Sequence, residues 1–260
     1  MPSSGPVEGL AAHEARWLEE EFGHDPAALA AAIERRRAHE PLQYVLGHWP
    51  FRRLDLVVDR RVLIPRFETE GLVDVALVAL GERARAIVVD LGCGSGAIGL
   101  ALASELAARG VVVELYAVDL SEEALDVARE NARRCGVAVH WRRGSWYEAL
   151  EPELAGRVDL IVANPPYVAA AEMSELAPEL AYEPRGALVA EDTPASPGFA
   201  DLAEVIAGAP RWLAPGGVLV AEHGADQGEA VLAAARAAGM REAIDHPDLS
   251  GWARVLEARR

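Results

Sequence analysis

The second half of the chain alternates between short apolar runs and longer segments whose apolar positions recur at helical spacing. From Ala86 onward each run of aliphatic residues is followed by such a segment, which predicts strands that alternate with helices. This order is typical of a mostly parallel sheet covered by helices on both faces. Seven strands are expected, at residues 87–91, 112–118, 137–141, 158–163, 218–222, 243–246 and 253–257. The intervening helices are expected after Gly96, Ser121, Asp201 and Asp226, and the short last two strands as an antiparallel hairpin.

The first third of the chain shows a different pattern. Residues 8–23 and 26–39 each carry apolar positions at helical spacing, and Asp25-Pro26 is typical of a helix start. Residues 51–63 alternate enough to predict a β-hairpin with its turn at Asp59-Arg60. We therefore expect three parts, which are a short helical cap at 1–48, a β-hairpin and connector at 49–70, and an α/β domain at 71–260.

Composition and charge narrow the class of protein. At 260 residues, 51% of them hydrophobic, the chain can bury a substantial core. No apolar run approaches the roughly 20 residues of a membrane span, and the first residues lack a signal sequence, so a cytoplasmic location is expected. Cys93 and Cys135 show neither a disulfide framework nor a metal-ligand spacing, and no metal site is expected. The formal net charge of -16 disfavours binding to nucleic acid.

A glycine-rich turn follows the first strand of the predicted sheet. Glycines let the backbone turn sharply and approach a ligand closely, and the helix that begins within the turn offers unpaired N–H groups. The second strand ends at Asp119, whose carboxylate can accept hydrogen bonds from both hydroxyls of a ribose. This arrangement predicts a nucleotide-type cofactor. The expected cofactor contacts are Asp90, Gly92, Cys93, Gly94, Ser95, Gly96 and Asp119.

Two kinds of cofactor fit the glycine turn. Residues 94–99 also satisfy the dinucleotide pattern G-x-G-x-x-G, so a dehydrogenase has to be weighed. However, Asp90 stands where it would repel a pyrophosphate but could hold an ammonium, and no dyad for hydride transfer is visible. S-Adenosylmethionine has an ammonium and a sulfonium and no phosphate, so the acidic site favours it. The predicted fold is then that of a Rossmann-like class I methyltransferase.

Trp146 is a further candidate for cofactor binding. It follows the third predicted strand in a loop with Ser145, where an aromatic ring can stack on adenine. Packing of Trp146 into the core is about equally compatible with the sequence.

The tetrapeptide Asn164-Pro165-Pro166-Tyr167 ends the fourth predicted strand. Two successive prolines cannot extend a strand, so these residues lie at the carboxyl edge, where open α/β sheets bind ligands. We assign catalysis to Asn164, Pro165 and Tyr167, with Pro166 as a further substrate contact and Asn164 also facing the cofactor methyl. The Asn164 oxygen and the Pro165 carbonyl would accept the two N–H groups of an amide or ring amine, and Tyr167 would cover its flat face.

These residues leave three functions open. One is methylation of an amide in a protein, and a second is amino methylation of an adenine or cytosine base. A third is a cofactor-binding module without catalysis. The net charge and the absence of an evident target-recognition domain disfavour the second.

Further stretches carry a resemblance to a known family. Residues 37–47 and 62–70, together with the glycine turn, Asp119 and the tetrapeptide, resemble the HemK family of N5-glutamine methyltransferases, and the similarity runs from about Arg35 through residues 182–184, 222–227 and 248–255. The Ile-Pro-Arg-x-Glu-Thr-Glu form at 64–70 is similar to the enzymes that modify peptide chain release factors. The branch acting on a ribosomal protein usually carries a Val-Pro-Arg-Ser-Pro form.

The resemblance implies methylation of the glutamine in the Gly-Gly-Gln loop of class I release factors, with S-adenosylhomocysteine as the second product. It implies that Gly92–Gly96, Asp119 and Trp146 bind the cofactor, that residues 164–167 bind the glutamine, and that the cap docks the substrate protein. Two departures stand out. The segment before Arg35 is much shorter than is usual in the family. Ser145 stands where an acid commonly precedes the aromatic, so the contact with the adenine amino group is expected to be weaker or made by backbone.

Overall fold

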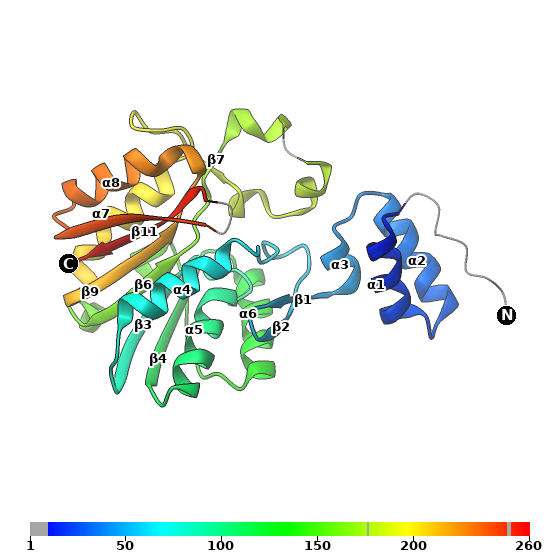
Figure 1. The fold of residues 1–260 in the computed structure, drawn as a ribbon, viewed down its shortest axis with the longest axis horizontal. Coiled ribbons are helices and arrows are strands. Elements are labelled where there is room, and N and C mark those ends of the chain that lie inside the picture. The colour runs from blue at the N-terminus through cyan, green and yellow to red at the C-terminus, as the bar shows by residue number, and fades with distance from the viewer. Residues whose placement is uncertain (1–9, 176, 249–250) are drawn as a thin grey trace.

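A computed structural model describes residues 10–175, 177–248 and 251–260. An α/β domain contains a seven-stranded sheet, and a small helical cap stands to one side of it (Figure 1). The order across the sheet is β10-β11-β9-β6-β3-β4-β5, in which β9, β6, β3, β4 and β5 run parallel and β11 is antiparallel to both of its neighbours, β9 and β10. The strands are β3 (Arg85–Leu91), β4 (Val112–Asp119), β5 (His140–Arg143), β6 (Val158–Ala163), β9 (Leu213–Glu222), β10 (Glu242–Pro247) and β11 (Ala253–Arg259).

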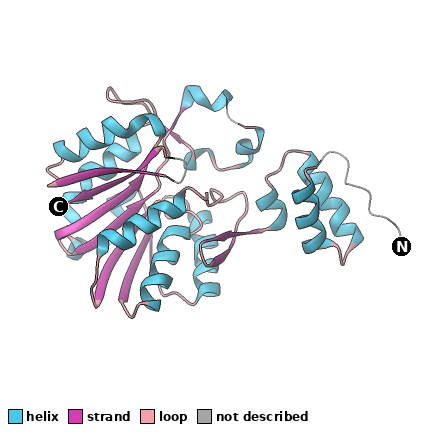
Figure 2. Cartoon of the chain, viewed as in Figure 1, coloured by secondary structure: helices cyan, strands magenta, loops and turns pink. Residues whose placement is uncertain are grey.

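Helices cover both faces of this sheet, as Figure 2 shows by colour. One face packs against α4 (Thr69–Leu80), α5 (Ala97–Ala108) and α6 (Glu122–Cys135), and the other against α7 (Ala200–Trp212) and α8 (Gly228–Ala237). Since β3 and β6 lie in the middle and are covered on both faces, nearly all of their residues are buried, which explains their continuous apolar runs. The predicted fold class and the closing antiparallel hairpin are confirmed.

The cap consists of α1 (Ala12–Phe22), α2 (Pro26–Arg37) and the short α3 (Leu42–Leu46). The predicted helices at 8–23 and 26–39 are confirmed as α1 and α2, although residues 8 and 9 lie outside the described chain. The Asp25 carboxylate accepts the backbone N–H groups of Ala27 and Ala28 and so caps α2. Leu18 and Ala32 form the centre of a small apolar core that the cap builds for itself.

The β-hairpin lies earlier in the chain than the sequence predicts. It pairs β1 (His48–Phe51) with β2 (Leu54–Val57), so the turn falls at Arg52 and Arg53, and the predicted turn at Asp59-Arg60 is wrong. Arg52 adopts a left-handed φ of 52°, which a bulky residue rarely does. Its backbone N–H donates to the Glu70 carboxylate, and its guanidinium contacts Glu105. Tertiary ion pairs therefore hold a turn that lacks glycine.

An insertion follows β6 and reaches back to the cap. It contains the short parallel pair β7 (Val168–Ala169) and β8 (Val189–Ala190) and the turns η3 (Ala170–Glu175), η4 (Pro178–Tyr182) and η5 (Arg185–Ala187). Tyr182 donates its hydroxyl to the backbone oxygen of Ala38, and Arg36 pairs with Glu179 at 3.2 Å. The insertion is thus a bridge between the cap and the sheet. Other short turns are η1 (Trp146–Ala149), η2 (Pro152–Leu154) and η6 (Ala225–Gln227).

Candidate active site

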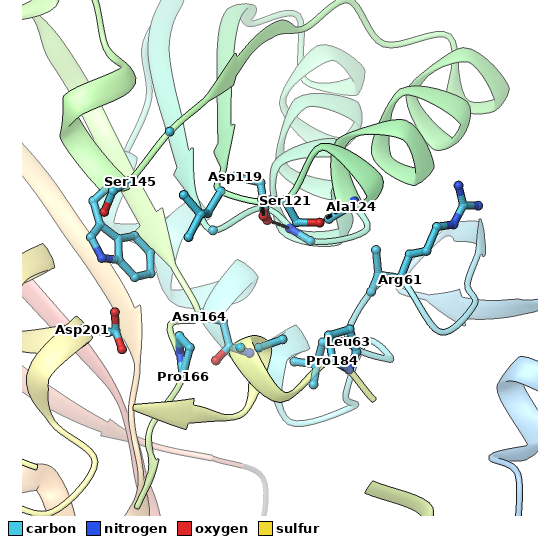
Figure 3. Close-up of a pocket in the computed structure, with 18 residues that line it drawn as sticks. Arg61, Leu63, Asp119, Ser121, Ala124, Ser145, Asn164, Pro166, Pro184 and Asp201 are labelled. Atoms are coloured by element: carbon cyan, nitrogen blue, oxygen red, sulfur yellow. Dashed lines mark hydrogen bonds between the residues drawn. The ribbon is translucent and has the colours of Figure 1, made fainter. Parts of the chain in front are cut away.

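A cavity of about 430 Å³ opens at the carboxyl ends of the central strands (Figure 3). The chain passes from β3 to β4 and β5 on one side and then returns to β6 on the other side of β3. Such a reversal leaves a crevice between neighbouring loops. The lining residues are Arg61, Val62, Leu63, Gly92, Gly94, Asp119, Leu120, Ser121, Ala124, Gly144, Ser145, Trp146, Asn164, Pro166, Pro184, Gly186, Ala187 and Asp201.

The glycine turn is fastened to the end of β4. The N–H groups of Gly92 and Cys93 both donate to the Val118 oxygen, at 2.8 and 2.9 Å, and Gly94 donates to Asp119. A Cβ added to Gly92 would lie 3.1 Å from the ring of Trp146, so only glycine fits there without displacement. Gly92 and Gly94 line the cavity. The other predicted contacts of the turn, Cys93, Ser95 and Gly96, do not line the cavity, and all three are buried.

Asp90 lies beneath the turn, away from the cavity wall. Its Oδ2 accepts the N–H of Gly99 at 2.9 Å, and its buried Oδ1 has no partner among the described residues. Burial raises the pKa of Asp90 to about 7. This position supports the start of α5 directly. The structure does not bring Asp90 to the cavity, so its predicted contact with the cofactor stays a prediction.

Asp119 lines the cavity, and its carboxylate also binds the backbone of two loops, at Gly94 and at Ser121. Its Oδ2 accepts from Gly94 N–H at 2.8 Å and its Oδ1 from Ser121 N–H at 2.9 Å. Burial raises the pKa of this carboxyl group. A carboxylate oxygen accepts more than one hydrogen bond, so both oxygens retain capacity for the hydroxyls of a ribose.

Trp146 lies on the cavity wall and also packs against the core. It adopts a left-handed φ of 40°, and its side chain lowers the pKa of the Asp201 carboxyl group, which burial raises. Its neighbour Tyr147, which is also partly buried, packs against the same core, stacks on Trp212 and donates to the Val205 oxygen. Of the two roles that the sequence left open, the cavity position is the one compatible with a stacking partner for a base.

Asn164 is held by a hydrogen-bonded chain at the end of β6. Its Nδ2 donates to Thr69 Oγ1 at 3.3 Å, and the Thr69 hydroxyl donates to Glu222 Oε2 at 2.7 Å. Because the single hydroxyl proton of Thr69 is directed at Glu222, Thr69 can only accept from Asn164. This contact fixes which end of the amide is the oxygen. The Oδ1 of Asn164 therefore remains an acceptor at the cavity wall.

The two prolines help to keep the Asn164 oxygen without a local hydrogen bond. An asparagine oxygen in a turn commonly accepts the N–H of the residue two positions on. Here that residue is Pro166, and Pro165 also lacks an N–H. The local backbone can thus offer no donor to the Asn164 oxygen.

The other members of the tetrapeptide take different positions. Pro166 lines the cavity, whereas Pro165 is buried and Tyr167 lies behind the wall. The hydroxyl of Tyr167 donates to Glu222 Oε1 at 3.4 Å, and burial raises its pKa to about 12. Tyr167 therefore supports the site in this structure, and its contact with the substrate stays a prediction.

Three site residues escaped the sequence analysis, namely Thr69, Asp201 and Glu222. Thr69 and Glu222 lie in stretches that carry the family resemblance, where Thr69 begins α4 and Glu222 ends β9. Neither stretch of sequence by itself indicates that Thr69 and Glu222 form a hydrogen bond across 153 positions. Asp201 lies in the first turn of α7, where an acid is an ordinary helix residue.

A second cavity, of about 570 Å³, lies between the cap and the insertion. Residues adjacent in the chain line the two cavities, since Leu63 and Pro184 line the first and Ile64 and Glu183 the second. Glu183 accepts the N–H of Ile64 at 3.0 Å and pairs with Arg66. The remaining lining residues are His13, Glu14, Trp17, Arg36, Pro41, Leu42, Gln43, Trp49, Ala177, Glu179 and Leu180.

Two further features are absent from the described residues. These residues contain no group of three or more His, Cys, Asp or Glu side chains placed to hold a metal ion. None of the helices they form combines the length and apolar character that a membrane crossing requires.

The fold and the cavity define a class I methyltransferase. The family described as "Methyltransferase small domain" matches residues 73–190. A solved structure described as a methyltransferase from Pyrococcus furiosus aligns with a TM-score of 0.55 at 16% identity, over 88% of this chain and 96% of that one, which supports the fold.

Full-length relatives identify the family. A release factor glutamine methyltransferase of Bordetella pertussis is 44% identical over 94% of this chain and 82% of its own length. One from Xylella fastidiosa is 41% identical over 94% and 86%. The chain belongs to the family of release factor glutamine methyltransferases.

Proposed function

We propose that this protein transfers a methyl group from S-adenosylmethionine to the side-chain amide nitrogen, N5, of the glutamine in the Gly-Gly-Gln loop of class I release factors. The observation that carries the proposal is the free Oδ1 of Asn164, which the contact with Thr69 orients and the two prolines leave without a local donor. The family to which the chain belongs supports the choice of acceptor.

The cavity fits the proposed cofactor in size and charge. Its volume of about 430 Å³ lies within the range of small-molecule sites. Asp119, Asp201 and Arg61 are the charged groups among the described lining residues, and Arg61 is paired with Asp59 at 2.6 Å. Gly92, Gly94, Asp119 and Trp146 would hold the cofactor. When bound, it supplies a methyl group activated by a positively charged sulfur.

The chain's own part in the reaction is to hold a poor nucleophile. The lone pair of an amide nitrogen is delocalised, so its direction toward the methyl group decides the rate. Asn164 Oδ1 accepts one N–H of the glutamine amide and the Pro165 carbonyl accepts the other. Glu222 acts through Thr69 and keeps the Asn164 amide from rotating. Preorganised acceptors of this kind stabilise the positive charge that develops on nitrogen. The methylated nitrogen would then release one of its two protons to solvent, which leaves a neutral amide.

The cavity between the cap and the insertion is the proposed docking site of the release factor. It adjoins the cofactor cavity through residues 63–64 and 183–184, so a loop of a protein bound there can reach Asn164. Its wall joins apolar rings, including Trp17 and Trp49 packed edge to face, with charged groups such as Arg36. The described part of the segment 1–48 supplies one side of this wall. A cytoplasmic location remains a prediction.

Two alternatives share the same chemistry. One is a glutamine in a ribosomal protein, and the other is an exocyclic amine of adenine or cytosine in nucleic acid. The net charge of -16 opposes the second, because it repels the phosphate backbone.

Incubation with labelled S-adenosylmethionine tests the proposal. Label should enter a class I release factor and be lost when the glutamine of its Gly-Gly-Gln loop is replaced by alanine. DNA and ribosomal proteins serve as competing substrates at equal concentration. Label on DNA, or equal label on the parent release factor and its alanine variant, would contradict the proposed function.

A further inference from the structure

The order of loops along the sheet edge assigns each part of the cofactor to a strand. Asn164 follows β6, Gly92 follows β3, Asp119 follows β4, and Ser145 and Trp146 follow β5, and these strands are neighbours in that order. With the methyl group at Asn164 and the ribose at Asp119, the adenine extends toward β5. The region around Ser145 and Trp146 is therefore the adenine end of the cavity.

Ser145 supplies no carboxylate at that end. The family resemblance of the sequence implies an acid at this position, where it would accept a hydrogen bond from the amino group of adenine. A carboxylate nevertheless lines the same end of the cavity, from a remote position in the chain. Asp201, in the first turn of α7, lies on the same side of the cavity as Ser145 and across from Arg61 (Figure 3).

Asp201 and Trp146 both line this cavity. Burial raises the pKa of the Asp201 carboxyl group, and the Trp146 side chain opposes that rise. A carboxylate can accept several hydrogen bonds, so Asp201 has capacity for a donor of the ligand.

We propose that Asp201 recognises the exocyclic amino group of the adenine in the cofactor, in place of an acid at position 145. This inference rests on the proposed function. A carboxylate only accepts hydrogen bonds, so it favours a base that carries an amino group at C6. It repels hypoxanthine, which carries an oxygen at the same position. Asp201 would thus determine which purine the cavity selects.

Paired ligands that differ only at C6 test this role. Calorimetry with S-adenosylhomocysteine and S-inosylhomocysteine gives a ratio of two dissociation constants for each variant. The wild-type protein should prefer the adenosyl ligand by about 10-fold or more, the discrimination expected of a hydrogen bond to a charged group. Asp201→Asn should bring the ratio close to one, because an amide can donate to the C6 oxygen. The double variant Asp201→Asn, Ser145→Asp should restore the preference.

Control measurements separate the other roles of this acid. Glu204→Gln, an exposed acid on the same helix, should leave the ratio unchanged, and melting temperatures show whether each variant is folded. If Asp201 only positions Trp146, Asp201→Asn weakens both ligands equally and the ratio stays at its wild-type value, which overturns the inference. A loss confined to S-adenosylmethionine would assign Asp201 to the sulfonium and overturn it too. Failure of the wild-type protein to bind the adenosyl ligand would instead contradict the proposed function.

Discussion

Two asparagines of this protein lie in neighbouring regions and use their amides in opposite ways. Asn131, on α6, is fully buried, with its oxygen accepting Val57 N–H at 2.7 Å and its nitrogen donating to the oxygens of Val57 and Ser95. Asn164 donates to Thr69 but, among the described residues, receives no hydrogen bond on its oxygen. The first amide joins the hairpin to the glycine turn. The second keeps its acceptor for a ligand.

The comparison teaches how the same side chain becomes structural or functional. Asn131 meets an extended backbone segment at Val57 and completes its hydrogen bonds as a further strand would. Asn164 is followed by two residues without N–H groups. A polar side chain with unused hydrogen-bonding capacity therefore indicates a functional site better than burial alone does.

Replacement of Asn164 by alanine should have the largest effect. We expect the rate of methyl transfer to fall by about 10²–10³-fold, the usual loss when one preorganised polar group is removed from a transition state. Affinity for S-adenosylhomocysteine and the free energy of unfolding should stay near wild type, since the Asn164 oxygen is not used within the fold. Single-turnover kinetics and calorimetry measure the two quantities. Loss of cofactor binding together with activity would contradict this role.

Replacement of Asn131 by alanine should show the opposite profile. It leaves the N–H and C=O of Val57 and the oxygen of Ser95 without their partner, so we expect a destabilisation of about 2–3 kcal/mol. Urea unfolding measures this change. At a temperature where the variant is folded, methyl transfer should fall by less than about 10-fold. A loss of activity as large as that of Asn164→Ala would break the comparison.

Asp90 tests the rule inside the core, where one oxygen has no partner. Its pKa is raised by burial from 3.8 to about 7, so the folded state favours the protonated form. Its contribution to stability is complete below pH 3.8 and is lost as the pH rises through 7. Between pH 5 and pH 8 the wild-type protein should lose about 2 kcal/mol relative to Asp90→Asn, which cannot ionise. Denaturant unfolding across this pH range measures the difference, and parallel curves for the two proteins would refute it.

Thr69→Val should give the smallest effect. It removes the hydroxyl that holds Asn164 while it keeps the shape of the side chain, so kcat should fall by about 10-fold through loss of one hydrogen bond. The KM for the release factor should change little, and Thr69→Ser should retain most of the rate. A serine variant as slow as the valine variant would show that the hydroxyl does not orient Asn164.

Local patterns predicted the parts of the site that depend on one strand and its loop. Gly92, Gly94, Asp119 and Asn164 all reach the cavity wall because each follows a strand whose apolar run is visible in the sequence. Asp201 reaches the same wall only through the packing of α7, which no local pattern encodes. Thr69 and Glu222 likewise meet across 153 positions.

The misplaced hairpin has the same cause. Asp59 carries a turn signal and does form a local turn, with its side chain accepting the N–H of Arg61. The hairpin turn forms instead at Arg52, where Glu105, 53 positions later, holds the guanidinium. A short window of sequence does not show tertiary contacts of this kind. Local patterns therefore predict the hairpin turn at Asp59, a residue type that favours turns.

The attachment of the glycine turn to β4 has a thermodynamic consequence. The N–H groups of Gly92 and Cys93 are bound to Val118, and that of Gly94 to Asp119. The turn is thus held in one conformation by bonds within the fold, and its backbone has little conformational entropy left to lose on binding. Preorganisation of this kind lets more of the contact energy appear as affinity.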